Sequence, residues 1–200
     1  EIVISPQRTD DPSTRQRILE TADRLFYGEG LRATGIDRII GESGVAKRSF
    51  YRHFPTKQDL IVAFLEERRA AWIKWFRAEV DARLAKRGAG LEVIADVIES
   101  WFAQPDFRGC TFMNSVAEGA HEQAPIGRVV ADHERDLAVY IEELAARLDL
   151  TPPRRVSEAA VLVIAGAVTR AQITGQHGDP TVSRLLLRGI TSEFARKKAR

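Results

Sequence analysis

The sequence predicts an all-α protein of about nine helices. Through most of the 200 residues, apolar side chains recur every three or four positions, the spacing of one face of an α-helix. No segment alternates apolar and polar residues as a half-buried strand does. Glycine or proline separates successive helical stretches. We therefore expect helices joined by short turns, with no sheet.

The first elements are an arm and two helices. Residues 1–12 are polar, contain two prolines and are expected to form a flexible arm. The run Asp11-Pro12-Ser13 supplies helix-start residues, and the helix that follows ends near Gly28 and Gly30. Its apolar stripe consists of Ile18, Ala22, Leu25 and Phe26. A shorter helix with Ile36, Ile39 and Ile40 on one face ends at Gly44.

A short helix and a long helix come next. The short helix extends from Val45 to about Phe54, where Pro55 and Thr56 end it and cap the next helix. The long helix continues through Trp72 to about Leu84. The stretch 87–90, Arg-Gly-Ala-Gly, is expected to form a hinge.

The C-terminal half contains four further helices and a short apolar segment at 110–117. The helices are expected at about 91–102, 125–148, 156–174 and 180–197. Pro105, Pro125, Pro152 and Pro153 lie at or near the breaks between them.

Composition narrows the class of protein. The net charge of +2 argues against non-specific coating of nucleic acid and leaves room for a local basic patch. The single cysteine, Cys110, excludes an internal disulfide framework, and its apolar surroundings favour burial over a redox role. The apolar run 159–168 is too short to span a bilayer. We expect a cytoplasmic protein with no metal, no cofactor and no catalytic constellation.

Two short helices meeting at Gly44 form a helix-turn-helix pattern, since glycine can adopt the left-handed backbone of a tight interhelical turn. On the second helix, Phe50 and Phe54 share one face and can anchor it to a core. Arg48 and Arg52 point the opposite way. Four Lys or Arg and no acid lie between residues 45 and 57, which suits a phosphate backbone, although a solvated surface would look similar.

This pattern predicts a DNA-binding site. Arg and Lys can donate to guanine O6 and N7, so Lys47 and Arg48 are expected to read bases, with Arg52 as a third reader. Hydroxyl, imidazole and amine groups near helix ends can hold phosphates. That role is expected for Thr34, Ser49, Tyr51, His53 and Lys57.

Residues 14–65 resemble the DNA-binding domain of the tetracycline-repressor (TetR) family. The family pattern is a threonine, a hydrophobic-rich helix, Gly-Val, a short helix with Tyr-x-His-Phe, and a following lysine. The matching residues are Thr34, Ile36, Ile39, Gly44, Val45, Phe50, Tyr51, His53, Phe54 and Lys57. Gly35 departs from the Ser or Thr that many members carry there, but glycine is an acceptable N-cap.

The resemblance implies a homodimer that binds a palindromic DNA operator. It also implies a DNA-binding domain at 13–56 and a ligand-binding and dimerisation domain at 57–200. The last two helices of the family commonly pair with those of a partner in a four-helix interface. Residues expected there are Ala159, Val163, Ala167, Ala171, Leu185, Leu186 and Ile190.

Bulky aromatic residues concentrate in the second domain and make an apolar effector pocket plausible, although core packing would explain each of them singly. The expected ligand-binding residues are Trp72, Phe76, Trp101, Phe112, Met113 and Tyr140. The predicted function is a repressor that a small hydrophobic or aromatic effector releases from its operator. The alternative is a dimeric DNA-binding regulator without such an effector, controlled by a protein partner or by abundance.

Overall fold

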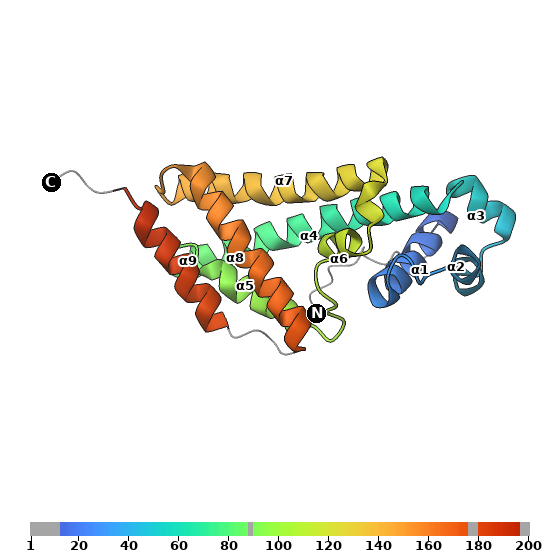
Figure 1. Ribbon diagram of the computed structural model, residues 1–200, viewed down its shortest axis with the longest axis horizontal. Helices are drawn as coiled ribbons and strands as arrows, with labels where there is room; N and C mark the ends of the chain where they lie inside the picture. The colour runs from blue at the N-terminus through green and yellow to red at the C-terminus, as the bar shows by residue number, and fades with distance from the viewer. Residues whose placement is uncertain (1–12, 88–89, 176–179, 197–200) are drawn as a thin grey trace. The chain divides into compact units, whose positions relative to one another are not determined.

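The computed structural model describes residues 13–87, 90–175 and 180–196 (Figure 1). In these three ranges the chain forms nine α-helices and one 3₁₀ turn, and the only β pairing is an isolated bridge between Leu150 and Ala195. The all-α prediction is confirmed. The predicted arm at 1–12, part of the hinge at 87–90 and the break at 176–178 lie outside the described residues.

The helices follow the predicted order closely. Their bounds are α1 Thr14–Glu29, α2 Ile36–Ser43, α3 Lys47–His53, α4 Lys57–Arg87, α5 Val93–Phe102, α6 Thr111–Ala117, the 3₁₀ turn η1 Ala120–Glu122, α7 Ala124–Arg147, α8 Pro153–Thr174 and α9 Pro180–Phe194. The apolar segment expected at 110–117 is helix α6. Helix α3 begins two residues later than predicted, because Ala46 has the extended backbone of an N-cap.

The chain divides into two compact units. Among the described residues, one contains 13–72 and 110–133, and the other contains 73–87, 90–109, 134–175 and 180–196. The long helices α4 and α7 each contribute residues to both. The compact units therefore divide elsewhere than at residue 56, and the functional boundaries 13–56 and 57–200 stay a prediction.

The core of the first unit combines side chains from distant parts of the chain. Its N-terminal part comes from α1, α2, α3 and the start of α4, including fully buried Ile18, Ile39 and Phe50. The segment α6–η1–α7 completes the same core with Phe112, Ala120, Ile126 and Val129. The three N-terminal helices thus bury apolar surface against a segment more than 50 residues further along the chain.

A buried ion pair joins α1 to α4 in this unit. Arg68 donates from Nε to Oδ1 of Asp23 at 2.5 Å and from Nη2 to Oδ2 at 3.0 Å. Its guanidinium carbon also lies 3.7 Å from the ring centroid of Tyr27. Both charged side chains are about nine-tenths buried, so each satisfies the other where water cannot.

The second unit packs α5, α8 and α9 against one another. The amide of Leu91 donates to the hydroxyl of Thr191 at 3.1 Å, which ties the start of α5 to α9. The parts of α4 and α7 in this unit meet at Tyr140, whose hydroxyl donates to Asp81 at 3.0 Å. Arg147 donates to the same carboxylate at 2.8 Å.

Helix α8 is apolar through most of its middle and carries Arg154, Arg155 and Glu158 near its start and Arg170 near its end. By length and composition alone it could cross a membrane, and one third of its most apolar window is buried. The run 159–168 is by itself too short to span a bilayer, whereas the helix that contains it has 22 residues. A helix of this kind needs something to cover its exposed apolar face.

Candidate nucleic-acid interface

Helices α2 and α3 meet at Gly44, which has the left-handed backbone that the sequence predicts, with φ 63° and ψ 24°. Arg17 of α1 holds this turn in place. Its Nη2 donates to the carbonyl oxygen of Ser43 at 2.8 Å and to that of Gly44 at 3.3 Å. A cation at the C-terminal end of α2 suits the partial negative charge of the carbonyls there.

The inner face of α3 is anchored as predicted. Phe50 is fully buried and Phe54 is nearly so, with their ring centroids 6.2 Å apart. The ring of Tyr51 packs edge-on against Phe50 at 5.3 Å and is 39% exposed. Because the two phenylalanines fix the orientation of α3, the opposite face must point to solvent.

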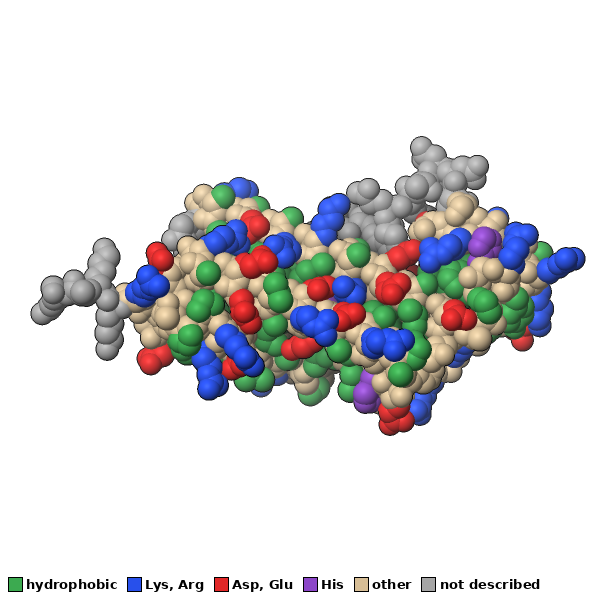
Figure 2. Space-filling model, turned by 90° about the horizontal axis from the view of Figure 1, so that it is seen from above, with side chains coloured by type: hydrophobic (Ala, Val, Ile, Leu, Met, Phe, Trp, Pro, Cys, Tyr) green, Lys and Arg blue, Asp and Glu red, His purple; other side chains and the backbone are tan. Residues whose placement is uncertain are grey.

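The outer face of α3 is basic. Lys47, Arg48 and Arg52 are exposed, while Ser49 and His53 are half-buried beside them. Within the described ranges, neither Arg48 nor Arg52 has an ion-pair partner, so both guanidinium groups can reach an external acceptor. Figure 2 shows mostly Lys, Arg and His side chains around the α2–α3 end, whereas acidic and basic side chains mix over the α4–α7 part of the same face.

Lys47 pairs with an acidic side chain of α2. Its Nζ lies 3.0 Å from Oδ1 of Asp37, and this hydrogen bond raises the pKa of Lys47. Both side chains are more than half exposed, so the pair contributes little to stability. Lys47 can therefore exchange Asp37 for an external acceptor at small cost.

Two glutamates near α2, Glu42 and Glu29, are paired with arginines. Glu42 accepts from Arg24 at 2.5 Å and from Arg38 at 2.7 Å, and these two hydrogen bonds lower the pKa of Glu42. Arg38 also bonds Glu29 at the end of α1. This pairing limits the repulsion that free carboxylates would exert on DNA phosphates.

Thr34 does not lie where the sequence analysis expects it to act. Its side chain is fully buried, and its hydroxyl lies 2.8 Å from the carbonyl oxygen of Gly30 and 3.3 Å from that of Leu25. The predicted phosphate contact by Thr34 is therefore wrong. The residue closes the turn between α1 and α2, which is reason enough for a threonine at this position.

Lys57 begins α4 and is half-buried. Burial lowers the pKa of Lys57, and the negative charge of Glu118 opposes this shift. The start of the helix is capped by Thr56, whose hydroxyl accepts from the amide of Asp59 at 3.1 Å while the Asp59 carboxylate accepts from the amide of Thr56 at 3.0 Å. The cap fixes where the Lys57 side chain leaves the helix.

The six residues predicted to bind an effector do not form one group. Trp72 and Phe112 belong to the first unit, and both pack on His133, at 5.1 Å and 3.8 Å between centroids. In the second unit, Phe76 contacts Tyr140 and Trp101 contacts Phe102 and Phe107. Five of the six are buried and Met113 is half-buried. These contacts describe core packing.

The predicted interface residues differ in exposure. Leu185 and Leu186 on α9 are 65% and 50% exposed, whereas Ala159, Val163, Ala167 and Ile190 are half-buried. Ala171 is only 4% exposed and has almost no surface to offer a partner, so its assignment to an interface is wrong.

Sequence reasoning missed three large exposed apolar side chains on these helices, Leu162, Ile173 and Val182. Their spacing from the predicted residues was a usable signal, because each lies one to four positions from them along a helix. It also missed Arg17, and for that residue the pattern held no signal, since the turn it holds is 26 residues away.

Comparison with known proteins agrees with this geometry. The family model described as "Bacterial regulatory proteins, tetR family" matches residues 18–64, which include α2, Gly44 and α3. An uncharacterized HTH-type transcriptional regulator from the lacX 3′ region of Lactococcus lactis is 25% identical over 169 residues. That alignment covers 81% of this chain and 85% of the relative.

Solved structures extend the similarity to nearly the whole chain. A TetR-family transcriptional regulator from Streptomyces coelicolor is 29% identical, with a TM-score of 0.74 over 92% of this chain and 96% of the other. A putative TetR regulator from Streptomyces avermitilis is 28% identical, with a TM-score of 0.70 over 90% and 96%. The chain thus carries a helix-turn-helix region that matches the TetR family of bacterial regulators, and over nearly its whole length it is similar to TetR-family transcriptional regulators.

Proposed function

We propose that this regulator binds a palindromic operator as a homodimer and represses transcription until a small apolar effector releases it. The observation that carries the proposal is helix α3, whose buried Phe50 and Phe54 turn Arg48 and Arg52 outward. The α-helix fits the major groove, where guanidinium groups can read guanine edges. Regulators of this family bind DNA operators and act as dimers.

The division of labour on α3 follows from exposure. Arg48 and Lys47 would read bases, with Arg52 as a third reader. Tyr51, Ser49, His53 and Lys57 lie toward the sides of the helix or at the start of α4 and would hold phosphates. Phosphate contacts give affinity without sequence preference, so the two groups differ in what their loss should do.

The proposed dimer interface uses the apolar surface of α8 and α9. Five large side chains there are half or more exposed: Leu162, Ile173, Val182, Leu185 and Leu186. Leaving such surface in water is costly, at about 25 cal/mol per Å². A second copy covering this surface would account for it and for the membrane-like composition of α8.

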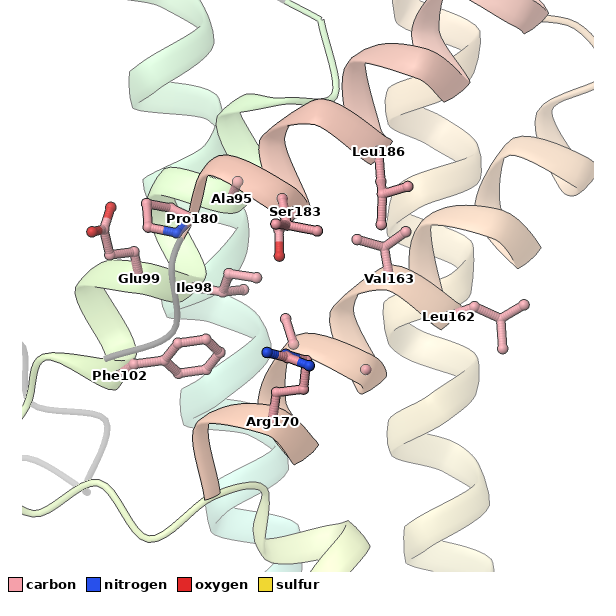
Figure 3. A pocket seen from close by; sticks show the side chains of 13 residues that line it. Ala95, Ile98, Glu99, Phe102, Leu162, Val163, Arg170, Pro180, Ser183 and Leu186 are labelled. Carbon is pink, nitrogen blue, oxygen red and sulfur yellow. The ribbon is translucent and has the colours of Figure 1, made fainter. Parts of the chain in front are cut away.

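The effector proposal is supported by a pocket in the second unit. The pocket has a volume of about 460 Å³ and lies between α5, α8 and α9. Figure 3 shows Ile98 and Phe102 of α5 on one side and Val163 and Leu186 on another, with Arg170 below. The size and the apolar walls suit a small hydrophobic molecule. This pocket replaces the predicted aromatic group, none of whose members lines it.

The DNA-binding proposal is tested by selection of duplexes from a randomised library, followed by footprinting and salt titration. Replacing Arg48 by Ala should weaken the selected duplex by about 1–3 kcal/mol and relax preference at one position. Replacing Lys57 by Ala should weaken all duplexes alike and flatten the salt slope by about one. Equal loss of preference in both variants would contradict the assignment of roles.

The effector proposal is tested by filling the pocket. Gly166 lines it, and a Cβ added there would meet no atom within 4 Å. Gly166→Leu should lose the response to those hydrophobic compounds that release the wild-type protein. Because the pocket shares Val163, Ala167 and Leu186 with the proposed interface, the comparison is made with a variant that light scattering shows to be a dimer and that binds the operator as the wild type does. If no compound in a broad panel releases the wild-type protein, the alternative holds, and control lies with a protein partner or with abundance.

A further inference from the structure

The carboxylate of Glu118 bonds the turn that precedes the helix-turn-helix. Oε1 accepts from the amide of Leu31 at 3.1 Å, and Oε2 accepts from the amide of Arg32 at 2.7 Å. Glu118 is the C-cap of α6, and the two amides directly follow the end of α1. The contact therefore joins segments 86 and 87 residues apart within the first unit.

Glycines on both sides permit this close approach. Gly30 has φ 96°, and a Cβ there would lie 3.1 Å from Oε1 of Glu118. Gly119 has φ 71°, and a Cβ there would lie 3.1 Å from Nη2 of Arg32. Both conformations disfavour other residues, so the local sequence on each side accommodates the bond.

The turn that Glu118 holds sets the start of α2. Leu31 is buried in the core, and Thr34 bonds back to Gly30. Gly35, the N-cap of α2, provides no side-chain cap bond. Because α2 lacks its own side-chain cap, the turn before it helps to set where the helix begins. The Thr34 hydroxyl and the Glu118 carboxylate both hold that turn.

Opposing electrostatic effects act on the Glu118 carboxylate. A carboxylate beside the C-terminal end of α1 meets the partial negative charge of that helix end, which is unfavourable. Two charge-assisted hydrogen bonds offset this cost and hold the carboxylate in place. Glu118 is half-buried, so water can replace the contact if the carboxylate is lost. Removing the bond therefore need not expose a large part of the core.

We infer that Glu118 is a positioning residue for DNA binding, which fixes the turn before α2 through its two bonds to the amides of Leu31 and Arg32. The inference rests on the proposed function. While the bond is intact, α2 and α3 keep the placement that reads the operator. Without it, the turn loses these two bonds, and discrimination between operator and other DNA falls.

The test compares two variants that remove the same charge. In Glu118→Gln the amide can accept one of the two bonds, and its NH₂ then faces a donor. Glu122→Gln is the matched control, because Glu122 is exposed in the adjacent turn η1. Affinity is measured for a duplex selected by the wild-type protein from a randomised library and for a scrambled duplex of equal length. Loss of the charge should raise both affinities similarly in the two variants.

The ratio of the affinity for the selected duplex to that for the scrambled duplex measures discrimination, which is what positioning of α2 and α3 should affect. In Glu118→Gln it should fall at least about fivefold, the lower range of coupling between sites, and in Glu122→Gln it should stay at the wild-type value. Equal ratios in the two variants would overturn the inference. A wild-type protein that does not distinguish the duplexes would instead reject the proposed function.

A second measurement keeps the inference testable if Glu118→Gln folds poorly. In the ¹⁵N-labelled wild-type protein, the amide hydrogens of Leu31 and Arg32 should exchange slowly with solvent, because both donate to the carboxylate. Glu122→Gln should preserve this protection. Fast exchange of both amides while the protein remains folded would show that the bond does not form, and the inference would fail.

Discussion

Arg68 has a buried positive charge whose compensation depends on one carboxylate. Asp23 supplies both acceptor oxygens, and the ring of Tyr27 lies against the guanidinium. The attraction between two buried charges offsets their loss of hydration only when the geometry of the pair is good. The pair therefore contributes little net stability, but the loss of either partner leaves the other charge without compensation.

Replacing Asp23 by Asn should lower the free energy of unfolding by about 3–5 kcal/mol. The double variant Asp23→Leu/Arg68→Met should recover most of that loss, because no buried charge then remains. Urea unfolding of the three proteins measures both values. A single variant as stable as the wild type would mean that water reaches Arg68.

Alanine should have opposite effects on stability at two glycines, one inside α2 and one in the turn that follows it. Gly44 has a left-handed backbone, so Gly44→Ala should cost about 1–2 kcal/mol. Gly41 lies inside the helix, and a Cβ there would meet nothing within 4 Å. Gly41→Ala should therefore add about 0.5–1 kcal/mol. Thermal unfolding measures the change in stability of each variant. If both variants gain stability, or both lose it, the assignment of the turn to Gly44 is wrong.

At the scale of elements, α4 and α7 are joined in the second unit by a phenol. The ring of Tyr140 is buried against Phe76, and its hydroxyl shares the Asp81 carboxylate with Arg147. Burial, and then the negative charge of Asp81, raise the pKa of Tyr140 above its ordinary value. The neutral phenol is therefore the form that the folded protein prefers.

This preference predicts alkaline destabilisation. A raised pKa in the folded state contributes stability that is present below the unfolded value of about 10 and is lost as the pH rises through the folded value. The stability advantage of the wild-type protein over Tyr140→Phe should thus shrink between about pH 9 and 11. Chemical unfolding of both proteins across that range measures the difference, and a constant difference would contradict the raised pKa.

For the whole molecule, the α8–α9 surface predicts the oligomeric state. Leu162→Asp and Leu186→Asp would each place a carboxylate in the proposed interface, where it has no partner, and should yield monomers. The matched control is Val139→Asp on α7, since Val139 is 46% exposed and lies on neither helix. Light scattering gives the mass of each variant.

Monomers should bind a single half-site poorly, because a dimer spaces two recognition helices about 34–36 Å apart to match one turn of DNA. Dimers in both interface variants, with helical content preserved, would place the interface elsewhere. Monomers of the Val139→Asp control would likewise place the interface elsewhere, on a surface that includes α7.

Local patterns were enough to predict the helices and the reading face of α3. Phe50 and Phe54 recur at helical spacing, and Gly44 marks the turn, so the orientation of Arg48 follows from sequence alone. The same rules failed for Thr34, because its position near a helix start suggests a phosphate contact. Its actual acceptors are the carbonyls of Leu25 and Gly30, which only the folded turn brings close.

Non-local contacts explain the other failures. Trp72, Trp101 and Tyr140 are equally aromatic in the sequence, but they belong to separate packing groups that no periodicity distinguishes. Glu118 is one of many acidic residues, and its bond spans more than 80 residues. Likewise, the helical stripe of α6 shows that it buries one face without showing that this face completes the core of the N-terminal helices.

That shared core limits how the DNA-reading part can be transplanted. A chimaera cut at residue 56 would join the three N-terminal helices to a foreign body and discard Phe112, Ile126 and Val129, which fill the same core. The graft would leave a cavity in the core of the N-terminal helices, because the new protein would not supply side chains that match it. Exchange of specificity between relatives should therefore proceed by substituting exposed residues of α3, with the scaffold beneath it left intact.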